Sequence, residues 1–93
     1  MPLNHLEKQV ANLAKLAACK RYALEFWNTR LVIKRLEVTG PGEWEAYYDE
    51  PDTLTKESMT VTKVGDSLLA QYTDEPPLKI AIMDEPEEQE NAG

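Results

Sequence analysis

The residues with the clearest binding chemistry lie between positions 20 and 30, in the segment KRYALEFWNTR. Aromatic rings beside guanidinium and ammonium groups can stack on bases and hold phosphates, and the same residue types dominate the energy of protein–protein contacts. The candidate binding residues are Lys20, Arg21, Tyr22, Trp27 and Arg30. A second interpretation stays open at this point, in which the rings belong to the core and the cations form its solvated rim.

Residues for enzymatic catalysis are scarce. A nucleophile needs a positioned base, most often histidine, and the one histidine is His5, in the first turn of an expected helix. The one cysteine, Cys19, follows two alanines, where a small buried thiol is the default. Gly40 and Gly42 flank Pro41, which predicts a turn and not a phosphate loop. We therefore expect no enzyme, no catalytic residue and no cofactor.

Metal ligands are also few. One cysteine and one histidine cannot form a structural zinc site within one chain. The acidic segment 49–57 lacks the glycine and the alternate-position ligands of a calcium loop. The sequence therefore predicts no metal site.

Charge is divided unevenly along the chain. The 93 residues have 17 acidic and 10 basic side chains and a formal net charge of −7. Residues 1–38 have a surplus of four positive charges, and residues 39–93 a surplus of eleven negative ones. We favour plain solvation of two different surfaces as the explanation. The functional alternative is that a basic N-terminal element meets an anionic partner, while the acidic body repels the wrong partners. Because phosphates call for a basic surface, direct nucleic-acid binding is not expected.

Length and composition favour one domain in residues 1–83, followed by a disordered acidic tail in residues 84–93. A single cysteine excludes an internal disulfide and indicates a reducing compartment. We find no leader-like stretch at the start and no long apolar run, so we expect a cytoplasmic protein with no membrane contact.

Apolar residues recur at spacings of three and four near the start of the chain, which predicts an amphipathic helix over residues 4–28. Asn4 and Glu7 predict a capping box at its beginning. The apolar stripe consists of Leu3, Leu6, Val10, Leu13, Ala17, Leu24, Trp27 and Leu31. We expect it to pack on the chain's own sheet, while its heptad-like character also favours a homodimer.

Segment 59–73 predicts a β-hairpin. Gly65-Asp66 suits a type II′ turn, and the register set by this turn places apolar side chains on one face and polar ones on the other. The pairs are Val64 with Ser67, Val61 with Ala70, and Met59 with Tyr72.

Three more strands are predicted over residues 31–38, 43–48 and 78–83, with a polar connection over residues 49–58. The expected fold is α+β, with an N-terminal amphipathic helix packed on a four- to five-stranded antiparallel β-meander.

The sequence thus favours a small, acidic, non-enzymatic protein-binding module. It would be an inhibitor or regulator whose carboxylates occupy the basic, nucleic-acid-binding surface of a partner protein. One alternative is nucleotide or single-stranded nucleic-acid binding through residues 20–30. Another is a structural subunit of a larger assembly.

Overall fold

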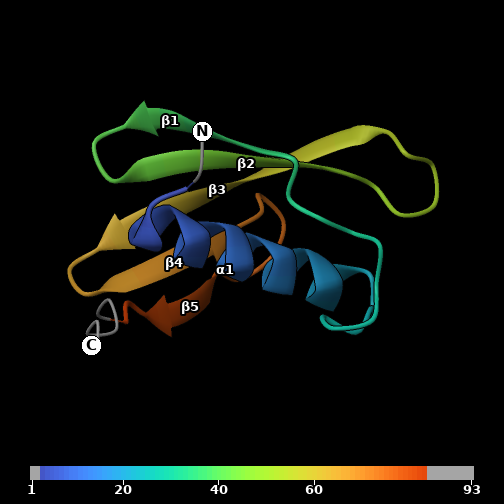
Figure 1. Cartoon of the computed structure of the whole chain (residues 1–93), viewed down its shortest axis with the longest axis horizontal. Coiled ribbons are helices and arrows are strands. Elements are labelled where there is room, and N and C mark those ends of the chain that lie inside the picture. Colours follow the sequence, from blue (N-terminus) through green and yellow to red (C-terminus); the bar gives the residue numbers. More distant parts are fainter. Residues whose placement is uncertain (1–2, 84–93) are drawn as a thin grey trace, which may run out of the picture.

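The computed structural model describes residues 3–83 and shows one helix lying across one face of a five-stranded sheet (Figure 1). Helix α1 spans His5–Arg21, and the strands span Arg35–Gly40 (β1), Glu43–Asp49 (β2), Lys56–Val64 (β3), Ser67–Gln71 (β4) and Leu78–Ala81 (β5). Neighbouring strands are antiparallel and follow the order β1-β2-β3-β4-β5. This confirms the predicted helix-on-meander fold, whereas the predicted tail over residues 84–93 lies outside the described residues.

The start of α1 is the predicted capping box. The Glu7 N–H donates to Oδ1 of Asn4 at 2.7 Å, and the Asn4 N–H donates to Oε1 of Glu7 at 3.1 Å. These two bonds satisfy backbone donors that have no partner inside the helix. After β5, the Met83 N–H donates to Oε1 of Gln9 at 2.8 Å, and the Met83 carbonyl accepts from Nε2 of Gln9 at 3.0 Å. These bonds bring the segment after β5 back to α1.

Helix α1 ends at Arg21, so the predicted extension to position 28 is wrong. Tyr22 is the C-cap, and Ala23 adopts a left-handed φ of 57°. The Leu24 N–H then donates to the Cys19 carbonyl at 2.8 Å, as in a Schellman motif. Glycine is the usual residue at the left-handed position, and because alanine stands there the sequence shows no stop signal.

Residues 22–34 connect α1 to β1 without helix or strand. The strand predicted over residues 31–38 therefore begins later, at Arg35, where the ladder with β2 begins opposite Tyr47. Leu31 is buried in the core, but it reaches the core from the connection and not from a helical stripe. The interpretation of Leu24, Trp27 and Leu31 as helix residues is therefore wrong.

The β3–β4 hairpin is the predicted one. Gly65 has a φ of 60° at the first position of a two-residue turn, and the predicted pairs at Val64 and Val61 are present. Strand β4 ends at Gln71, so the predicted pairing of Met59 with Tyr72 lies one step beyond the ladder. Strand β3 begins at Lys56, which shortens the connection predicted over residues 49–58, and β5 ends at Ala81 and not at 83.

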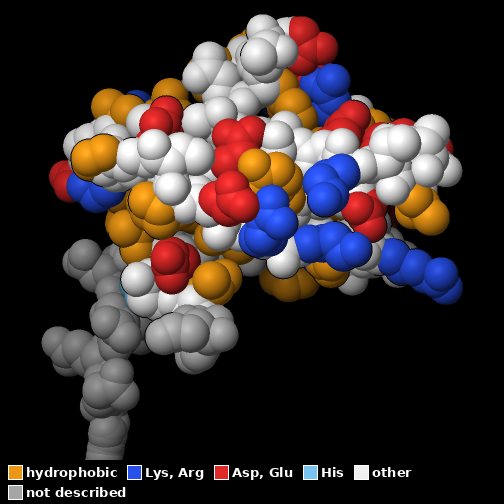
Figure 2. Space-filling model, turned by 90° about the horizontal axis from the view of Figure 1, so that it is seen from above, with side chains coloured by type: hydrophobic (Ala, Val, Ile, Leu, Met, Phe, Trp, Pro, Cys, Tyr) orange, Lys and Arg blue, Asp and Glu red, His pale blue; other side chains and the backbone are white. Residues whose placement is uncertain are grey.

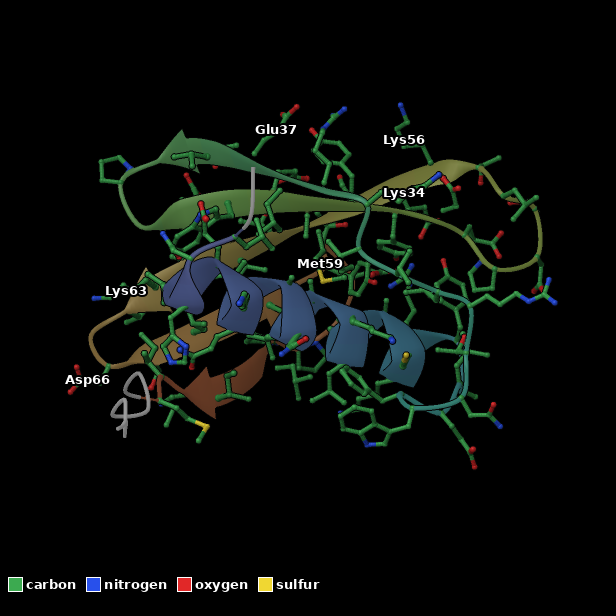
Figure 3. All side chains as sticks on the ribbon, viewed as in Figure 1. Lys34, Glu37, Lys56, Met59, Lys63 and Asp66 are labelled. Atoms are coloured by element: carbon green, nitrogen blue, oxygen red, sulfur yellow. The ribbon has the colours of Figure 1, made fainter. Side chains whose placement is uncertain are left out.

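The core lies between α1 and the sheet face that it covers, and Met59 is seen between β3 and the helix (Figure 3). Each large apolar side chain buried in this way contributes roughly 1.5–3 kcal/mol to folding. The buried residues are Val10, Leu13, Ala14, Ala17, Ala18, Leu31, Trp44, Ala46, Tyr48, Met59, Val61, Leu68 and Ala70. The opposite sheet face, here called the outer face, alternates with them and carries mostly polar side chains.

In the part of the chain that the structure describes, no helix has the length and apolarity to cross a membrane.

Candidate protein-binding surface

The structure separates the five predicted binding residues. Lys20 and Arg21 belong to the last turn of α1, and Tyr22 caps it. Trp27 and Arg30 lie beyond the helix, in the connection 22–34. The constellation expected over residues 20–30 is therefore not carried by one helix.

Arg21 is held by acidic residues of the β4–β5 connection. Its Nη1 donates to Oδ1 of Asp74 at 3.1 Å and to Oε2 of Glu75 at 2.9 Å. Its guanidinium also stacks 4.3 Å from the centre of the Tyr72 ring. The hydrogen bond from Arg21 lowers the pKa of Asp74 below its usual value. Arg21 thus positions a loop of its own chain.

Tyr22 belongs to a network of phenols around Glu57. Tyr22 and Tyr48 both donate to Oε1 of Glu57, at 2.5 and 2.9 Å, and the hydroxyls of Tyr48 and Tyr72 are 2.6 Å apart. Because the Tyr48 proton points to Glu57, Tyr72 is the donor of the third bond. Burial raises the pKa of Tyr22 and Tyr48, and it raises the pKa of Tyr72 to about 12. The network ties the end of α1 to β2, β3 and the end of β4.

Trp27 stands apart from this network, with 92% of its surface exposed. The interpretation of Trp27 as a core residue is therefore wrong. Its ring meets Phe26 edge to face, with centroids 4.7 Å apart, and the Lys15 ammonium lies 4.6 Å from the centre of the Phe26 ring. Beside the two rings lies a groove of about 440 Å³. It is lined by Asn12, Leu13, Leu16, Phe26, Trp27 and Ile80, and we call these residues the Trp27 surface.

Lysines of α1 continue the helix row to which Asn12 and Leu16 of the Trp27 surface belong, and Lys20 also lines a neighbouring pocket with Arg21 and Glu75. One row along the helix has a residue at every fourth position and consists of Lys8, Asn12, Leu16 and Lys20. Lys15 flanks this row. Within residues 3–83, the ammonium groups of Lys8, Lys15 and Lys20 form no ion pair. The one acidic residue of α1 is Glu7, which serves the capping box. An apolar groove with lysines close by on α1 thus lies on a chain whose net charge is −7.

A second group of cations lies at the edge formed by β1. Lys34 and Lys56 lie at the end of the sheet opposite the β3–β4 turn (Figure 3), where both line a pocket of about 260 Å³ together with Arg35. Lys34 pairs with Asp49 and Arg35 with Glu37, each at 2.9 Å. Seen from above, blue and red side chains accordingly lie side by side (Figure 2). Sequence reasoning missed this group, because Lys56 is far from the others along the chain.

The acidic residues between positions 49 and 57 mostly serve the fold. The Glu50 carboxylate accepts from the Asp52 N–H at 2.7 Å and from the Thr53 hydroxyl at 2.6 Å, which closes the β2–β3 turn. Across residues 3–83 no cluster of three or more His, Cys, Asp or Glu side chains is placed to hold a metal ion. The thiol of Cys19 is buried, and this burial raises its pKa.

Comparison with protein-family models, with curated proteins and with solved structures gives no significant match to this chain.

Proposed function

We propose that this chain is a non-enzymatic protein-binding module that docks through the Trp27 surface. The observation that carries the proposal is the 92% exposure of the Trp27 side chain beside an apolar groove. An aromatic side chain buries roughly 150–250 Å². At about 25 cal/mol per Å², covering it is worth about 4–6 kcal/mol before the costs of association. Tryptophan is accordingly enriched among the residues that dominate protein interfaces.

The surroundings of Trp27 support this function because they restrict its position before any partner binds. The neighbouring Phe26 ring contacts it edge to face, and Lys15 covers Phe26. The Asn28 N–H donates to the Glu25 carbonyl at 3.1 Å and closes a turn around the two rings. A turn that is ordered in this way loses less backbone entropy on binding. Leu16, with 41% of its surface exposed, extends the apolar area onto α1.

The experiment uses three forms of the full chain as bait, namely wild type, Trp27→Ala and Val38→Thr. Each form has a photo-reactive crosslinker next to the Trp27 surface, and the yield of crosslinked partner protein is measured. We expect Trp27→Ala to reduce crosslinked partner at least tenfold, in line with the loss of an interface anchor. Val38→Thr is the matched control, because Val38 is 70% exposed on β1 and lies outside the Trp27 surface. Equal yields from Trp27→Ala and wild type would show that the proposal is wrong.

In a finer form of the proposal, the chain blocks the basic, nucleic-acid-binding surface of a partner protein. Carboxylates on the outer face of the sheet support this form. Glu37 stands directly opposite Glu45 across β1 and β2, and Glu43 points to the same side. Like charges directly opposite destabilise a strand pair, and a basic partner would relieve this repulsion. The Ser58 hydroxyl fixes the Glu45 carboxylate at 2.6 Å.

The test of this finer form is the double variant Glu37→Gln/Glu45→Gln. It should bind a basic partner more weakly, because two carboxylates of the outer face are neutralised. If the double variant binds the basic partner as well as wild type does, the finer form is wrong and the Trp27 surface remains the proposed contact. Nucleotide binding through residues 20–30 has less support, since Arg21 and Tyr22 already bind Asp74, Glu75 and Glu57.

A further inference from the structure

We infer that the partner segment on the Trp27 surface is acidic and amphipathic, with apolar side chains for the groove and carboxylates for the lysines of α1. This inference rests on the proposed function and names the chemistry of the partner at the same surface.

The groove itself selects apolar side chains. Five of its six lining residues are aliphatic or aromatic, Asn12 is the exception, and no acidic or basic residue lines it. Its volume of about 440 Å³ lies within the range of roughly 300–1,000 Å³ that is typical of small-ligand sites. A charged group placed there would lose its hydration without gaining a partner. The anchors that fit are therefore aliphatic or aromatic.

The lysines of α1 select the charge of the partner. Lys8 and Lys20 are separated by three intervals of four residues, which is about 18 Å along a helix, and Lys15 lies between them beside Phe26. The side of α1 that faces away from the sheet is not covered by another described element (Figure 1). Carboxylates on the partner would pair with ammonium groups that form no ion pair within residues 3–83. Such pairs favour encounter and orientation more than affinity, which the apolar anchors supply.

Two other occupants fit less well. A second copy of this chain, docked by the same surface around a two-fold axis, would bring lysines against lysines. Residues 84–93 contain five acidic side chains but no large apolar one, so they lack an anchor for the groove.

The experiment titrates the full chain with two synthetic peptides of 14 residues. Both have Leu and Phe at helical spacings of three and four, and the other positions are glutamate in one peptide and lysine in its match. We expect the glutamate peptide to bind and the lysine peptide not to bind, as measured by calorimetry. Binding should weaken as salt is added, because exposed ion pairs are screened.

Two double variants with the same change in net charge distinguish the effect of the lysines of α1 from the effect of the protein's overall charge. Lys15→Gln/Lys20→Gln should weaken binding of the glutamate peptide about fivefold or more, whereas Lys56→Gln/Lys79→Gln should leave it within about twofold. Lys56 and Lys79 are exposed on the outer face, away from the groove. Equal losses in both variants would overturn the inference.

Other outcomes also decide the question. Preferential binding of the lysine peptide, or no binding of either peptide, overturns the inference. A concentration-dependent dimer that Trp27→Ala abolishes also overturns it, because a second copy would then occupy the surface. A carbodiimide crosslink from Lys15 to residues 84–93, together with no peptide binding, overturns it as well. The proposed function fails separately, when partner crosslinking is insensitive to Trp27→Ala. If crosslinking depends on Trp27 but not on Lys15 and Lys20, the function stands and the inference is wrong.

Discussion

The two ends of the segment KRYALEFWNTR contain similar residue types but have opposite environments. At one end, Arg21 and Tyr22 are engaged by Asp74, Glu75 and Glu57 of the chain itself. At the other end, Trp27 is almost fully exposed beside an apolar groove. A cation or an aromatic ring that lies near buried or acidic groups of its own chain therefore takes a structural role. Only a side chain without such neighbours stays available for a partner.

The largest effect on stability is expected at the first end, in Glu57→Ala. This change removes the acceptor of Tyr22 and Tyr48, and Tyr48 is fully buried. The Tyr48 hydroxyl keeps Tyr72 but loses its charged acceptor, so the free energy of unfolding should fall by about 1–3 kcal/mol. Urea unfolding measures this loss, with Glu25→Ala as the control at an exposed acid. Equal stability of the two variants would mean that the network does not hold the end of α1.

The same network predicts a pH dependence. Burial raises the pKa of Tyr72 to about 12, whereas an unfolded tyrosine titrates near 10. The folded state therefore keeps its proton where the unfolded state loses it, so stability should be full below about pH 10 and decline as pH rises toward 12. Urea unfolding at pH 8–12 checks this, and Tyr72→Phe should make the decline less steep, because only Tyr22 and Tyr48 then contribute to it. Tyr47→Phe, on the outer face, is the control and should leave it unchanged.

A smaller effect, of opposite sign, is expected at the boundary between the two ends. Ala23 adopts a φ of 57°, which costs energy for any residue with a Cβ atom. Ala23→Gly should therefore raise the free energy of unfolding by about 0.5–1 kcal/mol. Ala11→Gly, inside α1, is the matched control and should lower it, since glycine weakens a helix interior. A loss of stability in both variants would argue against the left-handed cap.

The smallest effect on stability is expected at Trp27, although it has the largest side chain of the segment. Because its surface is exposed, Trp27→Ala should change the free energy of unfolding by no more than about 0.5 kcal/mol. Thermal unfolding measures it alongside Glu57→Ala. A large loss at Trp27 would remove the contrast between the two ends and would favour a core role after all.

Several features of the fold were determined by the sequence alone. Asn4 and Glu7 set the start of α1, Gly65 set the hairpin turn and its register, and the alternation around Trp44 set the buried face of β2. Each depends on residues that are close together along the chain, where hydrogen bonds over three positions or a single permitted φ act locally. Such signals hold wherever the segment lies in the molecule.

The end of α1 and the position of Trp27 were decided by the tertiary structure. The apolar spacing continued past Arg21, but the chain leaves the helix and buries Leu31 in the core from the connection. The same spacing is compatible with either path, and packing against distant strands selects between them. The groove likewise needs Ile80 of β5 beside Leu13 and Phe26. Contacts between residues so far apart depend on how the whole sheet is placed, which no local pattern specifies.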